Sequence, residues 1–309
     1  MDYGKLMLST LAEVRKGESV CVVADDEVPA GFTKPLIDAG KGVGAEIHFL
    51  KVKRRDIESP LVLDVLSRYT VVFVFSTVNL DFESIHKVTS TGSRLIGVPY
   101  IEANTMEPIL VDYEKMRQEG EKLCRIISKG REIRVTSPLG SDLTLSAHGR
   151  RAIYYSDRAT RRGENVVLPT GAMTVSPIED FGEGSLVIDG VTWFLGRVSE
   201  PFKLVVKRGR VVDIVGRGKE ATWMRDVLKP PFQNVNRLAE LLVGVNPKAT
   251  YDSYMPGGEK VRGAVSMDVG YQSAEGDTEV GKHTDIGSVR NATLTVDGQT
   301  IVDAGKLLL

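Results

Sequence analysis

Histidine and cysteine are scarce in this sequence, which contains four histidines and two cysteines among 309 residues. Cys21 and Cys124 both lie in apolar segments, SVCVVAD and KLCRIIS. Two cysteines in such surroundings are typical of buried, reduced thiols, and they do not form the framework of a small disulfide-stapled protein. We therefore expect thiols in a reducing compartment.

An excess of charge of one sign is also absent, because 40 lysines and arginines face 41 aspartates and glutamates. This balance gives no electrostatic reason to expect nucleic acid or an anionic membrane as a partner. Apolar runs stay well short of the roughly 20 residues that a membrane-spanning helix needs. The opening segment MDYGKLMLSTLAEVRKGE is amphipathic and differs from a signal peptide. We predict a cytoplasmic enzyme or binding protein.

The first 130 residues alternate between strand-like and helix-like segments. The strand-like segments are residues 19–25, 45–52, 70–77 and 94–100. They are largely apolar on both faces, which is typical of a parallel sheet covered by helices on both sides. The longest helical pattern, residues 111–130, ends at Gly130. We predict a Rossmann-like α/β domain over residues 1–130.

The pattern changes after residue 130. REIRVTSPLGSDLTLSAHGR contains two alternating runs joined by a turn, which indicates a hairpin. Short strands and glycine turns continue to the end of the chain, with a helical segment near KEATWMRDVL. We predict a mainly antiparallel α+β domain over residues 131–309, and we place the candidate functional site in it.

Three glycines, Gly40, Gly42 and Gly44, resemble a nucleotide-binding loop in their spacing. A loop that holds phosphate must follow a strand and open a helix, so that its amide groups point at the ligand. These glycines close a helical pattern and precede a strand, as glycines at the C-terminus of a helix do. A dinucleotide site is therefore not expected here.

A histidine and an aspartate stand two residues apart in GKHTDIGSVR, near the end of the chain. In an extended strand, residues i and i+2 point to the same side. His283 and Asp285 therefore form either a chelating pair for a divalent metal or an ordinary pair on a strand surface. The remaining histidines, His48, His86 and His148, have no companion at metal-ligand spacing and are interpreted as packed or solvated side chains.

Acidic residues supply the other metal-ligand candidates. Glu240 lies inside the apolar run RLAELLVGV, and a buried carboxylate must be paired, hydrogen-bonded or metal-bound. The alternative is a glutamate on the exposed face of a short helix. Asp268 in AVSMDVGY is a weaker candidate, because turns on both sides could expose it.

Several segments resemble the M29 family of thermophilic metallo-aminopeptidases, and they occur in the same order. They are RVTSPLGSDLTLSAHGR, LPTGAMTVSPIEDFGEGSLVIDG, PFKLVVKRGRVVDIVG, AELLVGVNPKA, MDVGY and KHTDIGSVRNATLTVDGQTIVDAGKL. The resemblance covers most of the chain after about residue 130. The same superfamily includes iron-dependent dihydroxypyridine ring-cleaving dioxygenases that share the histidine-any-aspartate element. The resemblance implies an α/β first domain, a metal-dependent enzyme and a homodimer.

The resemblance assigns metal ligation to Glu240, His283 and Asp285. Two further ligand positions of the family are occupied by Ala172 and Ser266, which cannot replace a glutamate and a histidine. This loss favours one divalent ion, Zn, Mn, Co or Fe(II), instead of two. Asp268 is a candidate substitute ligand, and a carboxylate that is not committed to the metal would act as the general base, so Glu240 and Asp268 are the candidate catalytic residues.

Three functions fit such a site. A hydrolase of the aminopeptidase or amidase type would use a metal-activated water. A ring-cleaving dioxygenase would use Fe(II), normally held by two histidines and one carboxylate. A protein with a decayed metal site would only bind or assemble. One histidine with two carboxylates favours the hydrolase, acting on a small molecule or a short peptide.

Arginines form the last informative group. Arg150 and Arg151 follow the SDLTLSAHG strand, and Arg161 and Arg162 lie in a predicted loop. A guanidinium fork can hold a substrate carboxylate through two hydrogen bonds, so Arg150 and Arg151 are the candidate substrate-binding residues. The alternative is that all four are solvated turn residues.

Overall fold

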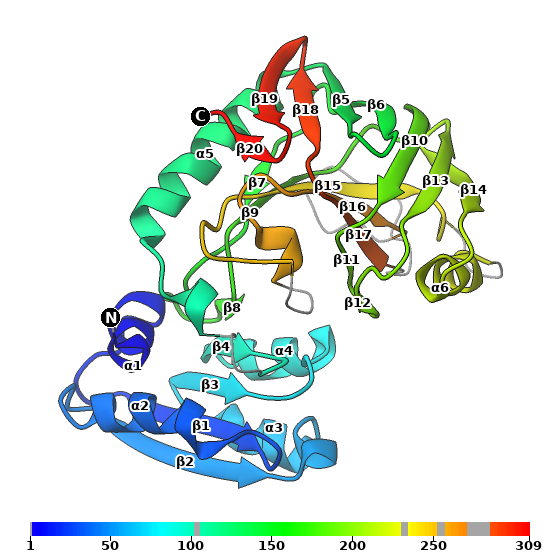
Figure 1. Ribbon diagram of the computed structural model, residues 1–309. Coiled ribbons are helices and arrows are strands. Elements are labelled where there is room, and N and C mark those ends of the chain that lie inside the picture. The colour runs from blue at the N-terminus through cyan, green and yellow to red at the C-terminus, as the bar shows by residue number, and fades with distance from the viewer. Residues whose placement is uncertain (1, 102–105, 230–233, 252–256, 271–284) are drawn as a thin grey trace. The chain divides into compact units, whose positions relative to one another are not determined.

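The computed structural model describes residues 2–101, 106–229, 234–251, 257–270 and 285–309. It divides the chain into two compact units (Figure 1). Unit 1 comprises Met1–Leu110 and Ser156–Thr170, and unit 2 comprises Val111–Tyr155 and Gly171–Leu309. None of the helices in these ranges has the length and apolar character needed to cross a bilayer.

Unit 1 contains one parallel sheet, sheet A, with the strand order β2-β1-β3-β4-β8. Its strands are β1 Ser19–Asp25, β2 Glu46–Val52, β3 Val71–Phe75, β4 Arg94–Val98 and β8 Asn165–Val167. All residues of β3 and β4 are buried, which explains why these segments are apolar on both faces. The predicted parallel sheet is confirmed.

The helices of unit 1 begin where the sequence places capping residues. Ser59 accepts a hydrogen bond from the Val62 amide at the start of α3 (Pro60–Leu66), and Asp81 accepts one from the Ser84 amide at the start of α4 (Phe82–Thr89). Earlier in the chain, α2 (Ala30–Gly40) ends at Gly40, and β2 begins at Glu46. The glycine-rich segment is therefore a helix end, as predicted. The helical elements are α1 Tyr3–Leu6, η1 Met7–Leu11, α2 Ala30–Gly40, η2 Arg54–Asp56, α3 Pro60–Leu66, α4 Phe82–Thr89 and η3 Glu107–Ile109.

Unit 2 contains two antiparallel sheets. Sheet B has the order β14-β13-β10-β6-β5-β18-β19-β20, and sheet C has the order β12-β11-β17-β16-β15-β9-β7. The strands of sheet B are β5 Glu132–Thr136, β6 Asp142–Ser146, β10 Gly182–Ile188, β13 Phe202–Lys207, β14 Arg210–Val215, β18 Thr293–Val296, β19 Gln299–Asp303 and β20 Lys306–Leu307. Those of sheet C are β7 Ile153–Tyr154, β9 Ala172–Val175, β11 Val191–Thr192, β12 Gly196–Arg197, β15 Leu238–Gly244, β16 Val265–Val269 and β17 Asp285–Val289.

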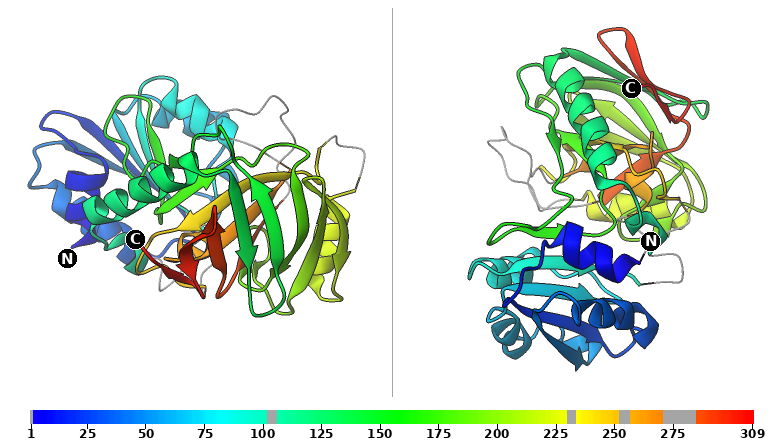
Figure 2. Two further views of the ribbon diagram at one scale, coloured as in Figure 1. Left: turned by 90° about the horizontal axis from the view of Figure 1, so that it is seen from above. Right: turned by 90° about the vertical axis from the view of Figure 1, so that its left-hand side faces the viewer.

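Helices complete unit 2 and confirm its predicted α+β character. The long helix α5 (Tyr113–Lys129) packs on β7 and β9, and Figure 2 shows it running along the strands of its own unit. Helix α6 (Lys219–Val227) packs on β13 and β14, where the sequence predicted helical structure. The short turn η4 (Gly258–Lys260) packs against β15.

The division between the units differs from the predicted boundary at Gly130. Helix α5 belongs to unit 2, because its apolar stripe packs on strands of sheet C. The later segment Ser156–Thr170 returns to unit 1 and supplies β8, the edge strand beside β4. An amphipathic pattern shows that a helix needs a covering surface, but it does not show which sheet provides that surface.

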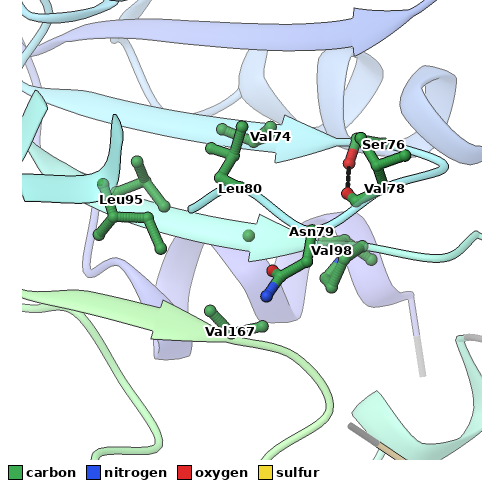
Figure 3. A pocket seen from close by; sticks show the side chains of 11 residues that line it. Val74, Ser76, Val78, Asn79, Leu80, Leu95, Val98 and Val167 are labelled. Carbon is green, nitrogen blue, oxygen red and sulfur yellow. Dashed lines mark hydrogen bonds between the residues drawn. The ribbon is translucent and has the colours of Figure 1, made fainter. Parts of the chain in front are cut away.

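At the carboxyl edge of sheet A, where open parallel sheets usually bind ligands, the carboxylate of Asp25 is hydrogen-bonded within the chain. Asp25 is fully buried there and accepts hydrogen bonds from the Thr77 amide (2.6 Å), the Thr77 hydroxyl (3.0 Å) and the Glu27 amide (3.0 Å). Beside β3 and β4 there is a cavity of about 10 Å³, lined mainly by Val74, Leu80, Leu95, Val98 and Val167 (Figure 3). A space of this size holds at most about one water molecule.

Candidate functional site

Glu240 lies in the middle of β15, a strand whose residues are all buried. Only 2% of its surface is exposed. Its Oε2 accepts hydrogen bonds from the Tyr155 hydroxyl at 2.6 Å and from the Thr174 hydroxyl at 2.8 Å. Both distances are those of well-formed hydrogen bonds from hydroxyl groups. The structure therefore excludes the alternative of a glutamate on an exposed helix face.

Asp268 lies on β16 directly opposite Glu240 in the antiparallel register. It is 5% exposed, so the turns that flank its strand do not leave it in solvent. Cross-strand partners point to the same side of a sheet, with Cβ atoms about 4.5–5.5 Å apart. Sheet C therefore presents two buried carboxylates side by side on one face.

Polar side chains continue along this face of sheet C. The register places Thr174 opposite Leu242, and Ser266 opposite Leu242 on the other side. Because side chains two residues apart share a face, Thr174, Ser266, Glu240 and Asp268 all lie on the same side of the sheet. All four residues are buried, which is unusual for polar groups that do not perform a function or form a closed network.

Tyr155 follows β7 and is held by a hydrogen bond from its amide to the Ala172 carbonyl oxygen. Burial, and then the negative charge of Glu240, raise the pKa of the Tyr155 hydroxyl well above its usual range. The hydroxyl therefore stays protonated at physiological pH and acts as a hydrogen-bond donor. No sequence pattern singles out this tyrosine.

A buried ion pair lies on the other side of the Tyr155 ring. Lys260 and Glu259, in η4, form a direct ion pair, and both residues are buried. The Lys260 ammonium lies 5.1 Å from the centroid of the Tyr155 ring, within the range of a cation–π interaction. Gly244 makes this packing possible, because a Cβ atom there would approach the Val261 carbonyl oxygen to 2.2 Å.

The two positions at which the resemblance indicated lost ligands also belong to this face. Ala172 begins β9 opposite Gly244, and Ser266 stands two residues before Asp268. The Ser266 hydroxyl is fully buried, and within the described ranges it has no hydrogen-bond partner. Glu240, Asp268, Ala172 and Ser266 therefore occupy one surface of sheet C.

The predicted histidine ligand, His283, lies outside the described residues. Asp285 begins β17 with its backbone opposite Val269, the residue after Asp268, and its side chain also lies outside what is described. Among the described residues, no group of three or more histidine, cysteine, aspartate or glutamate side chains is arranged to hold a metal ion. The ligand set of Glu240, His283 and Asp285 thus stays a prediction.

The two candidate substrate-binding arginines lie at the turn before β7. Arg150 forms an ion pair with Glu179 and is mostly buried, which makes it part of the packing between two turns of unit 2. Arg151 is exposed and lies near Cys124 of α5, whose pKa it influences. Neither residue makes a described contact with Glu240 or Asp268, so their role in binding substrate also stays a prediction.

Comparison with known proteins supplies the family. Over residues 6–309 the sequence matches the family described as 2,5-dihydroxypyridine 5,6-dioxygenase. The chain belongs to this family. The match spans both units, and it confirms that the chain is a divergent member of the superfamily that the sequence segments suggested. No curated protein sequence matches the chain.

Solved structures agree with this dioxygenase family. The fold is similar to that of the 2,5-dihydroxypyridine dioxygenase from Pseudomonas putida KT2440, with a TM-score of 0.77 and 18% identity, covering 99% of this chain and 96% of that one. It is also similar to AmpT from Thermus thermophilus, with a TM-score of 0.70 and 14% identity, covering 99% and 98% of the two chains. At such identities the likeness establishes the fold. Together with the family, it indicates an enzyme.

Proposed function

We propose that this protein is a metal-dependent ring-cleaving dioxygenase that acts on a small hydroxylated nitrogen heterocycle, with its active site on the polar face of sheet C. The observation that carries the proposal is the buried cross-strand pair Glu240 and Asp268, in a chain that matches a dioxygenase family from residue 6 to residue 309. The sequence favoured a hydrolase on ligand type alone, and the family now favours the oxygenase alternative.

The residues of this face suit a divalent metal ion. Two adjacent buried carboxylates repel each other and lose their hydration, unless a cation or a shared proton lies between them. Carboxylate oxygens are good ligands for Fe(II), Mn(II) and Zn(II). Glu240 and Asp268 would hold the ion, together with the predicted ligands His283 and Asp285. A bound Fe(II) ion would supply the redox chemistry that O₂ needs to react with an electron-rich ring.

The neighbouring side chains would fix the site and its charge. Tyr155 and Thr174 donate to the same oxygen of Glu240 and so set the orientation of this carboxylate, as outer-shell donors do for metal-ligating carboxylates. Because the single proton of Tyr155 is donated to Glu240, the lone pairs of the Tyr155 oxygen could accept a hydrogen bond from a ring hydroxyl of the substrate. Lys260 adds a buried positive charge beside the Tyr155 ring.

A hydrolase remains the second candidate, and the donor set favours it. Three carboxylates with one predicted histidine resemble the ligands of metallohydrolases more than the two-histidine, one-carboxylate set of iron oxygenases. In this case the ion held by these residues would supply a more acidic water and a polarised peptide or amide carbonyl, and Asp268 would serve as the proton acceptor. We further propose a homodimer that acts on a small molecule in the cytoplasm.

Two assays on one preparation distinguish the candidates. Protein purified without oxygen is loaded with Fe(II), and oxygen uptake is followed with 2,5-dihydroxypyridine. The same protein, loaded with Zn(II) or Co(II), is tested on an aminoacyl p-nitroanilide. Uptake of O₂ that depends on the pyridine supports the dioxygenase, whereas release of p-nitroaniline without O₂ uptake supports the hydrolase. If the protein binds no divalent ion, both proposals fail.

The matched variants are Glu240→Gln and Glu132→Gln. Glu240 is buried on sheet C, whereas Glu132 is an exposed glutamate on a strand of the same unit. We expect Glu240→Gln to abolish the activity and Glu132→Gln to retain it. Equal activities would place the reaction elsewhere in the molecule.

A further inference from the structure

A basic cleft of about 400 Å³ lies in unit 1. It is built from residues at or just before the amino ends of β1, β3, β4 and β8, which form the edge of sheet A opposite the carboxyl edge. Four of the eight lining residues are arginines, and one is acidic. The lining residues are Arg15, Glu18, Thr70, Gly92, Arg94, Thr160, Arg161 and Arg162.

Arg94 forms the base of this cleft, and its charge is already balanced. Its side chain is 5% exposed. The guanidinium donates to the Glu18 carboxylate at 2.6 Å, to the Ala12 carbonyl oxygen at 2.8 Å and to the Thr160 carbonyl oxygen at 3.3 Å. Arg94 therefore ties the walls of the cleft together.

The other three arginines form no described ion pair with the nearby carboxylates. Glu18 accepts hydrogen bonds from the Arg15 amide and from Arg94, and Glu164 accepts them from the amides of Thr160 and Arg161. Within the part of the chain that is described, no side-chain ion pair forms between a carboxylate and Arg15, Arg161 or Arg162. These three side chains are exposed, so three positive charges face the cleft and solvent.

One of these arginines is accommodated by a glycine. Gly92 has a positive φ of 95°, and a Cβ atom at this residue would lie 2.5 Å from the Arg162 guanidinium. The absence of a side chain lets the guanidinium lie against the backbone, where it donates to the Thr91 carbonyl oxygen at 3.4 Å. Arg162 is thus held at the wall of the cleft and does not extend freely into solvent.

We propose that this cleft binds a small anion that carries two phosphate or carboxylate groups. Planar guanidinium groups match both kinds of oxyanion through paired hydrogen bonds. Three arginines without carboxylate partners supply more charge than a single inorganic phosphate needs. The volume lies in the range of small-molecule pockets, roughly 300–1,000 Å³. The proposal is independent of the reaction proposed for sheet C.

Isothermal titration calorimetry at fixed ionic strength tests this site in the full-length protein. The probes are pyrophosphate, succinate and inorganic phosphate. We expect one saturable site per chain for pyrophosphate or succinate, with weaker binding of inorganic phosphate. The stronger of the first two probes shows whether the natural ligand is a phosphate ester or a dicarboxylate. Absence of saturable binding by all three probes overturns the proposal.

Two paired variants locate the binding. Arg161→Ala/Arg162→Ala removes two arginines of the cleft, whereas Arg54→Ala/Arg55→Ala removes two adjacent exposed arginines elsewhere in the same unit. We expect Arg161→Ala/Arg162→Ala to weaken binding by about tenfold or more, because the anion loses the guanidinium groups that form paired hydrogen bonds with it. The control variant should bind the anion as tightly as the wild type. An equal loss of affinity in both double variants would show that the anion is attracted by the net charge of the protein and not by this cleft, which would overturn the proposal.

A third variant separates a loss of anion binding from a loss of folding. Arg161→Lys/Arg162→Lys keeps both charges and removes the guanidinium forks, so we expect an unchanged melting temperature and binding that is weakened several-fold. If this variant binds as tightly as the wild type, the cleft attracts anions without recognising them, and the proposal is wrong.

Discussion

The two units of this protein each bury a charged side chain, and they treat the charge in different ways. In unit 1, Arg94 is surrounded by three acceptors, one of which is the oppositely charged Glu18. In unit 2, Glu240 accepts hydrogen bonds from two neutral hydroxyls and stands across the strands from a second carboxylate, Asp268. In the first arrangement, the positive charge of Arg94 is balanced by the carboxylate of Glu18 within the fold. The second places like charges together, which is typical of a site that is completed by a bound cation.

The largest expected change in the free energy of unfolding follows from removing Arg94 in unit 1. Arg94→Ala leaves the carboxylate of Glu18 without its buried counter-charge and two carbonyl oxygens without their donor, so we expect a loss of about 3–5 kcal/mol in the free energy of unfolding. Urea denaturation monitored by circular dichroism measures it. The control is Arg134→Ala, which removes an exposed pair with Asp142 and should cost less than about 1 kcal/mol. Similar losses in both variants would show that the Arg94 pair is not special.

Neutralising Glu240 in unit 2 should not lower the free energy of unfolding, in contrast to the removal of Arg94. Glu240→Gln keeps the size of the side chain and an oxygen acceptor for Tyr155 and Thr174, and it removes the repulsion with Asp268. In metal-free buffer with a chelator, we expect the variant to be at least as stable as the wild type. Its affinity for a divalent ion should fall by about 100-fold or more. Urea denaturation measures the stability, and metal analysis of the same preparation measures the loss of metal binding. A strongly destabilised metal-free variant would mean that the Glu240 charge is structural.

A smaller effect is expected from Tyr155→Phe. This change removes one of the two described hydroxyl donors to Glu240 and keeps the ring beneath Lys260. A hydrogen bond to a charged group contributes about 1.5–3 kcal/mol, so metal affinity and stability should fall moderately and together. Tyr154→Phe, at the neighbouring and half-buried tyrosine, is the matched control. If the two variants behave alike, the hydroxyl of Tyr155 has no special role.

The smallest effect concerns the two cysteines, one in each unit. Burial raises the pKa of Cys21 to about 12 and that of Cys124 to about 11. A thiol whose folded pKa lies above its unfolded value stabilises the fold below the unfolded pKa, and this contribution is lost as the pH rises toward the folded pKa. Both thiols should therefore resist alkylation near pH 7, and stability should decline from about pH 9 upward. Replacing Cys21 by alanine should reduce that decline, and an unchanged pH profile would contradict the assignment.

The sequence predicted the fold and part of the candidate site. The apolar runs of β1 to β4 predicted a parallel sheet, because strands buried on both faces must be apolar throughout. For Glu240 the sequence leaves two alternatives open, a buried carboxylate or an exposed helix residue; the structure buries it on a strand, and its role as a metal ligand stays a prediction. Asp268 was selected with less support, since its burial depends on the strands on both sides of β16.

Tyr155, Thr174 and Lys260 were not predicted, and the reason is the register of sheet C. Tyr155 lies 85 residues and Thr174 lies 66 residues before Glu240 in the chain. They meet it because β9 pairs with β15 and β7 pairs with β9. Local patterns of hydrophobicity do not encode which distant strands become neighbours. Lys260 lies in a glycine-rich turn, PGGEKVRG, in which a lysine normally remains in solvent.

The return of Ser156–Thr170 to unit 1 has a consequence for how the protein is made. The first 110 residues leave the ribosome without their edge strand β8 and without the Thr160 carbonyl oxygen that accepts a hydrogen bond from Arg94. Unit 1 can therefore reach its final form only after β8 has emerged from the ribosome, by which time α5, β5, β6 and β7 of unit 2 have also emerged. A fragment truncated at Leu110 should expose the edge of β4 and associate through it. Folding during translation must accordingly pass through a stage in which both units are incomplete.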